Sequence, residues 1–114
     1  MPVIYLSPST QEYNPYVNTG TEEYWMNRLA DAMEPILDAT GIRWDRNTPD
    51  MTAASSIAAS NAGSYDLHLA LHSNASPAPR AGSQRGILAF YYPGSLWGRK
   101  AAEISCERPR RNVP

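Results

Sequence analysis

The spacing of the apolar residues changes repeatedly along the first 72 residues, and this change constrains the fold more than any other feature of the chain. Residues 3–6, VIYL, form a short apolar run that ends at Ser-Pro, which is typical of a buried strand. From Thr21 the apolar residues recur at steps of three and four, which predicts an amphipathic helix that ends at Gly41. Thr21 is a candidate N-cap, and the two glutamates after it favour the first turn. Pro35 is expected to kink or locally open this helix.

The chain then continues to alternate between strand and helix patterns. Residues 42–46, IRWDR, predict a second strand, and residues 48–50, TPD, predict the start of a helix that runs to about Ala62. Residues 65–72, YDLHLALH, predict a third strand, and residues 86–92, GILAFYY, a fourth. This order predicts an α/β fold in which a mostly parallel or mixed central sheet is flanked by helices.

Composition narrows the class of protein without indicating a function. The 114 residues suffice for one domain with a modest core. Ten basic and eleven acidic residues give a net charge of −1, which does not indicate a nucleic-acid partner. The single cysteine, Cys106, excludes an internal disulfide. The N-terminus lacks a basic segment followed by an apolar stretch, and no run approaches the ~18–20 apolar residues of a membrane span. We therefore expect neither a signal peptide nor a transmembrane segment.

Both histidines lie in DLHLALHSNAS, residues 66–76, four positions apart. On an extended strand His68 and His72 would be ~13 Å apart, too far to share one metal ion, which holds nitrogen ligands at ~2.1 Å. His72 lies where the predicted strand gives way to a polar loop, and ligands of open α/β sheets bind beyond the carboxyl ends of the strands. His72 is therefore the functional candidate, and His68 is expected to be structural and mostly buried.

Three short motifs, taken in order, resemble the zinc-dependent N-acetylmuramoyl-L-alanine amidases of the amidase-3 type. Residues 71–76, LHSNAS, resemble the family's Ser-Ile-His-x-Asn-Ala segment. Residues 22–33, EEYWMNRLADAM, resemble its glutamate helix, in which a zinc-ligand Glu precedes an Asn by four residues, so Glu23 and Asn27 match. GILAFYY resembles the family strand that follows the His segment. The resemblance covers roughly residues 3–105, the earlier part of a complete family domain.

The resemblance implies a zinc site and a bacterial cell-wall hydrolase. The implied metal ligands are Glu23 and His72, with Glu12 as a third candidate, because Thr10 occupies the place of the first zinc histidine in the family's Asp-Pro-Gly-His-Gly segment. A metal-bound water would attack the amide between N-acetylmuramic acid and L-alanine. The implied partners are the stem peptide and glycan of peptidoglycan, and the implied location is the cell wall or extracellular space, although no signal peptide is visible.

The resemblance also has a gap, since no residue matches the family's catalytic glutamate. That residue follows a late strand in a Glu-x-Gly-type segment, and the glutamates after His72, Glu103 and Glu107, lack this setting. We therefore assign no catalytic residue and expect this chain to be a poor amidase or none. Residues 1–105 are interpreted as the N-terminal part of an amidase-3-like catalytic domain, and residues 106–114 as an irregular tail at a truncated end.

Two other interpretations stay open. Loss of the Asp-Pro-Gly-His segment favours a non-catalytic descendant of the fold that binds peptidoglycan through the same crevice. Alternatively, the chain is a small α/β domain in which His72 and Glu23 have structural roles. Zinc content separates the metal site from the structural interpretation, and release of L-alanine termini from cell wall separates an enzyme from a binder.

Overall fold

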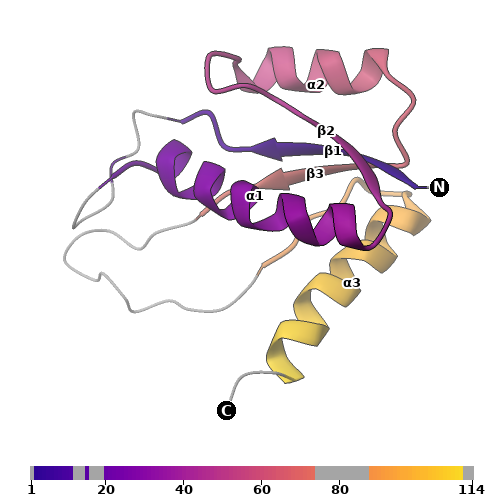
Figure 1. Cartoon of the computed structure of the whole chain (residues 1–114). Coiled ribbons are helices and arrows are strands. Elements are labelled where there is room, and N and C mark those ends of the chain that lie inside the picture. Colours follow the sequence, from indigo (N-terminus) through magenta and orange to yellow (C-terminus); the bar gives the residue numbers. More distant parts are fainter. Residues whose placement is uncertain (1, 12–14, 16–19, 74–87, 112–114) are drawn as a thin grey trace.

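A computed structural model describes residues 2–11, 15, 20–73 and 88–111, with the backbone alone described for residues 107–111. Three strands form one parallel sheet in the order β2-β1-β3: β1 (Val3–Pro8), β2 (Arg43–Arg46) and β3 (Leu67–Leu71). Three helices accompany the sheet: α1 (Glu22–Ala39), α2 (Ala53–Ala62) and α3 (Leu96–Arg111) (Figure 1). The predicted α/β fold is confirmed at this level, and all three strands of the described sheet are parallel.

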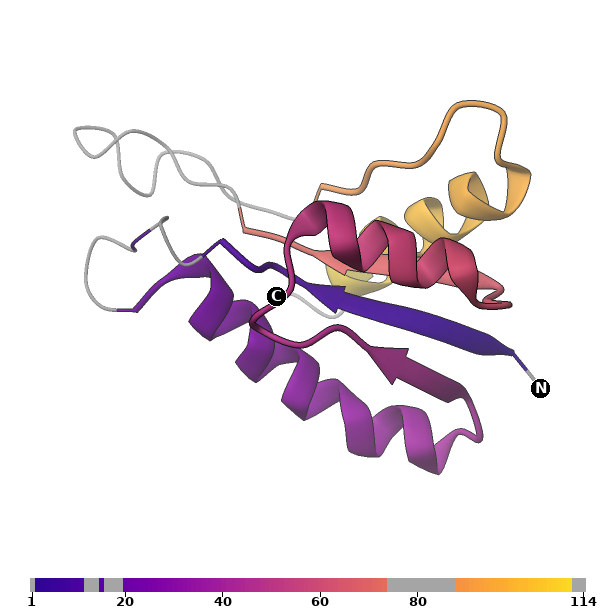
Figure 2. The ribbon, with the colours of Figure 1, turned by 90° about the horizontal axis from the view of Figure 1, so that it is seen from above.

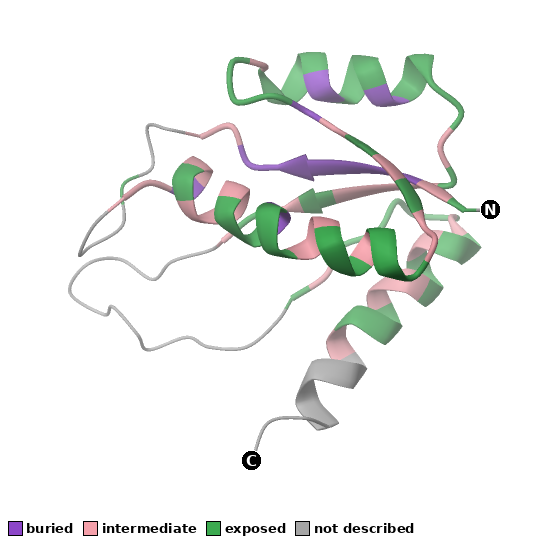
Figure 3. Ribbon diagram, viewed as in Figure 1, coloured by how far each residue is buried: buried purple, intermediate pink, exposed green. Residues whose placement is uncertain are grey.

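The central strand, β1, carries most of the buried core. It pairs with β2 from Val3 opposite Arg43 and with β3 from Ile4 opposite Leu67. Figure 3 shows β1 buried along most of its length, whereas the flanking strands are only partly covered. Few apolar side chains of the described residues are buried. Ile4, Tyr5, Leu6 and Pro8 come from β1, and Ala30 comes from α1.

The strand order places α1 and α2 on opposite faces of the sheet. The chain moves from β1 through α1 to β2 on one side, and then from β2 through α2 past β1 to β3 on the other. Because both crossovers between parallel strands are right-handed, the reversal of direction moves the second helix to the other face. Figures 1 and 2 show this arrangement, with α2 above the sheet and α1 below it in Figure 1. The carboxyl ends of all three strands therefore meet at one edge.

Helix α1 begins and ends where the sequence predicts. Thr21 is the N-cap, and its Oγ1 accepts a hydrogen bond of 3.1 Å from the backbone N–H of Tyr24. Gly41, just after the C-cap, has a φ of 76°, a left-handed conformation that glycine adopts without a Cβ clash. The helix continues on both sides of Pro35.

One arginine fastens α1 to the end of β2. Arg46 Nη1 lies 2.7 Å from Asp31 Oδ1 and 2.6 Å from Glu34 Oε2. Its Nη2 donates to the backbone and side-chain oxygens of Asn27 at 3.0 and 2.9 Å. The guanidinium thus joins three turns of α1 to the carboxyl end of β2, which fixes the helix over this part of the sheet.

Two predicted elements differ from the structure. Helix α2 starts at Ala53 rather than at residues 48–50, because Thr52 forms a capping box with Ser55, while Met51 N–H closes a turn onto the carbonyl of Thr48 at 3.0 Å. The predicted strand at 86–92 is wrong over its described part, since residues 88–92 form no strand. Phe90 and Tyr92 are more than four-fifths exposed, so the apolar run does not cover the sheet.

Helix α3 extends away from the sheet (Figure 1) and continues to Arg111, past position 106, where we expected an irregular tail. An i, i+4 ion pair of 3.0 Å between Arg99 and Glu103 supports its exposed surface. The division of the chain at residue 105 stays a prediction. Among the described residues, no helix is both long and apolar enough to span a membrane.

Candidate functional site

Three side chains from three different elements meet at the carboxyl edge of the sheet. Ser9 follows β1, Glu22 is the first residue of α1, and His72 follows β3. Ser9 Oγ donates a short hydrogen bond to Glu22 Oε2, and His72 Nδ1 lies 3.1 Å from the same oxygen. Ser9 is 2% exposed and Glu22 is 5% exposed, whereas nearly half of the His72 side chain reaches solvent. We call Ser9, Glu22 and His72 the edge cluster.

Local structure explains why these residues converge. The ladder between β1 and β3 continues one residue beyond the strands, because Ser9 N–H donates to the carbonyl of Leu71 at 2.9 Å. This bond brings the residue after β1 beside the residue that precedes His72. The capping interaction of Thr21 fixes the first turn of α1, and with it the direction of Glu22. The fold thus brings Ser9 and His72, which lie 13 and 50 residues from Glu22 in the sequence, to the same carboxylate.

Of the two glutamates in the first turn of α1, Glu22 is the one with a described contact to His72, whereas the sequence motif had indicated Glu23. Glu22 contacts His72, whereas Glu23 lies half-buried and its described contact is made by its backbone carbonyl, which accepts from Asn27 Nδ2 at 2.8 Å. The Glu-x-x-x-Asn spacing is therefore satisfied inside the helix, and Asn27 in turn binds Arg46. Neighbouring residues of a helix point about 100° apart, so only one of two adjacent glutamates faces the sheet. Whether either residue binds a metal stays a prediction.

The third candidate ligand, Glu12, lies outside the described residues. Thr10, which occupies the place of the family's first zinc histidine, is described and half-buried. Among the described residues there is no group of three or more His, Cys, Asp or Glu side chains placed to hold a metal ion. The edge cluster contributes two side chains of the types that bind zinc, Glu22 and His72.

Glu22 and His72 are in direct hydrogen-bond contact, and two ligands of one zinc ion would lie at a similar distance from each other. Ligands held at about 2.1 Å in a tetrahedral arrangement are roughly 3.4 Å from one another. The separation of 3.1 Å between His72 Nδ1 and Glu22 Oε2 is close to that value. The hydroxyl of Ser9 on the same carboxylate oxygen is the kind of second partner that ligating carboxylates have.

His68 is half-buried, whereas we expected it to be mostly buried, and its structural role stays a prediction. It lies inside β3, where it pairs with Tyr5 of β1, and its ring stacks on the Tyr5 ring with centroids 5.4 Å apart. Burial lowers the pKa of His68 below its usual value of 6.5. Because residues 67–71 form a strand, His68 and His72 cannot act as the i, i+4 pair of a helical metal site.

The edge cluster does not have the arrangement of a nucleophilic triad. In such a triad the serine bonds to the imidazole, and the carboxylate bonds to the far side of that ring. Here Glu22 stands between the other two, and the Ser9 hydroxyl directs its proton to the carboxylate. Ser9 is also almost completely buried, so a substrate carbonyl cannot approach its oxygen. The arrangement instead suits a carboxylate and an imidazole that act together on a bound ion or water.

Asn47, which the motif analysis did not single out, supports the loop that carries Ser9. It follows β2 and is 4% exposed. Its Nδ2 donates to Pro8 O at 3.0 Å, Ser56 Oγ at 3.1 Å and Ser7 Oγ at 3.2 Å. Asn47 therefore ties the end of β1 to α2. The available signal was positional, since Asn47 is the polar residue directly after the second predicted strand, residues 42–46, and Ser9 lies shortly after the first.

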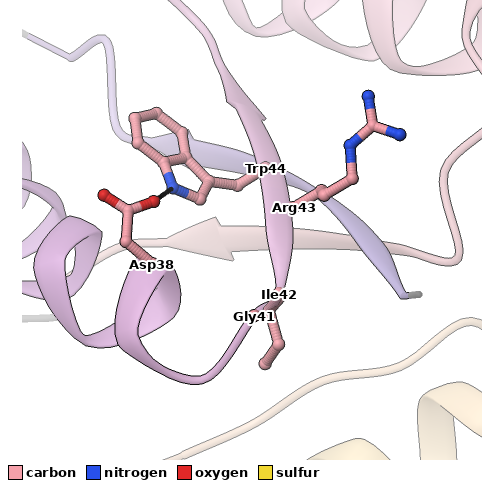
Figure 4. A pocket seen from close by; sticks show the side chains of 5 residues that line it. All are labelled: Asp38, Gly41, Ile42, Arg43 and Trp44. Atoms are coloured by element: carbon pink, nitrogen blue, oxygen red, sulfur yellow. Dashed lines mark hydrogen bonds between the residues drawn. The ribbon is translucent and has the colours of Figure 1, made fainter.

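An open hollow lies away from the edge cluster, at the end of the sheet where β2 begins. It is lined by Asp38, Gly41, Ile42, Arg43 and Trp44, around the turn from α1 into β2 (Figure 4). Trp44 Nε1 donates to Asp38 Oδ1 at 2.9 Å, so these two polar groups of the hollow are partners of each other. None of the sequence-predicted site residues contributes to it.

Comparisons of the chain with protein-family models, with curated proteins and with solved structures found no match. What is established is a small α/β fold with a parallel three-stranded sheet and a polar cluster at its carboxyl edge.

Proposed function

We propose that the chain derives from a zinc-dependent N-acetylmuramoyl-L-alanine amidase and acts on the amide that joins N-acetylmuramic acid to L-alanine. One observation supports this proposal above the others, namely the 3.1 Å approach of Glu22 and His72 at the carboxyl edge of a parallel sheet. The motifs that resemble the amidase-3 family contain these same two positions or their immediate neighbours. The proposal assigns Glu22, in place of Glu23, as the carboxylate of the site.

In the proposed site, Glu22 and His72 would hold the zinc, which when bound supplies a water of lowered pKa and polarises the substrate carbonyl. Glu22 comes from the buried side, where Ser9 orients its carboxylate. His72 comes from the exposed side, so substrate reaches the site past its ring. The substrate would be peptidoglycan, with the stem peptide and the glycan on either side of the reacting amide. Such an activity places the protein at the bacterial cell wall.

The described residues supply no obvious general base for this reaction. Glu103 lies in α3 and is paired with Arg99 at the surface, and the side chain of Glu107 is not among those described. Loss of a positioned proton acceptor typically reduces a rate by ~10²–10⁴-fold. We therefore expect slow amide cleavage, and a non-catalytic peptidoglycan-binding role is the second candidate. One observation favours this second role. The edge cluster contains two side chains that could bind a metal, Glu22 and His72, but the described residues include no general base beside them.

The experiment that tests the proposal compares two adjacent glutamates. The purified chain, Glu22→Gln, Glu23→Gln and His72→Ala are dialysed with zinc, and the bound metal and its affinity are measured by chelator competition. We expect the wild type and Glu23→Gln to bind one zinc ion, and Glu22→Gln and His72→Ala to lose it. Because Glu22→Gln and Glu23→Gln are the same chemical change one residue apart, a general effect of charge is excluded.

Activity is measured in parallel as new L-alanine N-termini released from purified cell wall. Slow release that depends on Glu22 supports the amidase, and zinc-dependent binding to cell wall without release supports the binder. A wild-type chain that binds no zinc, or variants that all bind it equally, would overturn the metal site and both roles built on it. Rapid release would show that the missing base is supplied by another group.

A further inference from the structure

We propose that Ser9 is a positioning residue that sets the metal affinity of the edge cluster by fixing the carboxylate of Glu22, an inference that rests on the proposed zinc site. Ser9 was not among the residues that the sequence motifs indicated. Its side chain is 2% exposed, and its hydroxyl makes no contact that a substrate could use. Its role is therefore to act through Glu22.

The backbone around Ser9 is fixed on two sides. Ser9 N–H donates to the carbonyl of Leu71 in β3 at 2.9 Å, and the preceding carbonyl, of Pro8, accepts from Asn47 at 3.0 Å. Both partners lie directly at the carboxyl edge, so the residue has little freedom to move independently of the sheet. The Cβ of Ser9 is consequently held in one place relative to β3 and His72.

The direction of the hydroxyl is fixed as well. The backbone N–H of Gln11 donates to Ser9 Oγ at 3.1 Å, which occupies an acceptor site on that oxygen. A serine hydroxyl has one proton to donate, and here Ser9 donates it to Glu22 Oε2. The two successive hydrogen bonds, from Gln11 N–H to Ser9 and from Ser9 to Glu22, therefore set the orientation of the carboxylate from the protein interior.

Both Ser9 and His72 contact the same atom, Glu22 Oε2. The same oxygen accepts from Ser9 and lies 3.1 Å from His72 Nδ1. Without the hydroxyl, the carboxylate would lose its buried partner, and its rotation about the last side-chain bond would separate it from the imidazole. Partners of this kind typically change metal affinity by ~10–100-fold when they are removed. We expect a loss in that range for Ser9→Ala.

The chain offers a matched control in a second buried serine. Ser56 is also 2% exposed, but its hydroxyl accepts from Asn47 and has no described contact with Glu22. The intact chain, Ser9→Ala and Ser56→Ala are titrated with Zn²⁺ in chelator competition, and with Co²⁺ while its visible absorption is recorded. We expect Ser9→Ala to bind zinc ~10–100-fold more weakly with an altered cobalt spectrum. Ser56→Ala should match the wild type in both, even if both variants lose similar stability.

A second pair of variants isolates the hydroxyl if Ser9→Ala does not fold. Ser9→Thr and Ser9→Val add nearly the same volume, so they strain the buried position alike, but only threonine keeps the hydroxyl. Tighter zinc binding by Ser9→Thr than by Ser9→Val supports the inference. Equal affinities in this pair, or wild-type affinity in Ser9→Ala, overturn it while leaving the metal site intact. Failure of the proposed function looks different, because the wild-type chain itself would then bind no zinc.

Discussion

Asn47 gives the sharpest test of how the carboxyl edge is held together, because one side-chain nitrogen serves three acceptors there. Asn47→Asp keeps the shape of the side chain and replaces this nitrogen by oxygen. The hydroxyls of Ser7 and Ser56 can rotate and donate to the new oxygen. The carbonyl of Pro8 cannot, since it has no proton, and Pro8 is among the most buried of the described residues. The substitution therefore places a carboxylate against a buried carbonyl.

The magnitude follows from these contacts. A buried carbonyl left without a donor costs about 1–3 kcal/mol, and an unpaired buried charge raises the cost of Asn47→Asp to about 3–5 kcal/mol at pH 7. The protonated acid carries an O–H that can donate to Pro8, so protonation is favoured in the folded variant. The folded pKa of the new carboxyl is then above its unfolded value of ~3.9. The variant should accordingly lose stability as the pH rises from about 4 towards 7.

The assay is urea unfolding followed by circular dichroism at pH 4 and pH 7, with the free energy of unfolding of the variant subtracted from that of the wild type at each pH. Ser56→Ala serves as the control, since it removes one acceptor of Asn47, introduces no charge and leaves the bond from Asn47 to Pro8 in place, and should cost about 1 kcal/mol with no dependence on pH. A cost of Asn47→Asp below about 0.5 kcal/mol, or one equal at the two pH values, would refute the assigned role of Asn47.

Two further predictions concern residues outside the edge cluster. Arg46→Met should lower the free energy of unfolding by about 1–3 kcal/mol. Most of this loss should come from the contact with Glu34, because the Asp31 side chain is largely exposed and its ion pair is screened by solvent. As a control, Arg43→Met changes an exposed position on the same strand and should have almost no effect in the same urea experiment. His68→Phe keeps an aromatic ring in β3 but removes a base whose pKa is lowered by burial. Because the unfolded state binds the proton more readily, His68 lowers the stability of the wild type as the pH falls below about 6.5. The difference in stability between the wild type and His68→Phe should therefore change between pH 5 and pH 8. A difference that stays constant over this range would contradict the burial of His68.

The first-turn glutamates show where motif spacing stops being informative. The rule that the ligand precedes Asn27 by four residues indicates Glu23. Residues 23 and 27 are indeed in contact, but this contact is a hydrogen bond within α1, from Asn27 Nδ2 to the backbone carbonyl of Glu23. Which glutamate faces His72 depends on how α1 is rotated about its axis. That rotation is set by contacts distant in sequence, among them the bonds from Arg46 to the face of α1 that carries Asn27. No local pattern contains this information.

The sequence by itself determined the elements whose signals are local. The apolar run of β1, the periodicity of α1 and its ends at Thr21 and Gly41 follow from steric and hydrogen-bonding preferences within a few residues. The parallel arrangement also followed, because strands that alternate with helices must return in the same direction. The position of His72 at the carboxyl edge also followed, since His72 comes directly after the third strand.

Only the tertiary structure decided the matters that depend on packing between distant segments. Residues 88–92 have the composition of a strand, but a strand needs a neighbour with free backbone groups in register, and in the described sheet they do not pair with one. Helix α2 has two possible N-caps in the sequence, Thr48 and Thr52. It starts after Thr52, because Thr52 forms a capping box with Ser55. Ser9 and Glu22 became partners because the ladder between β1 and β3 extends one residue further and α1 presents one particular side to it. A hydroxyl 13 positions from a carboxylate has no signature in the sequence; its role exists only because the fold brings the two together in a place from which water is excluded.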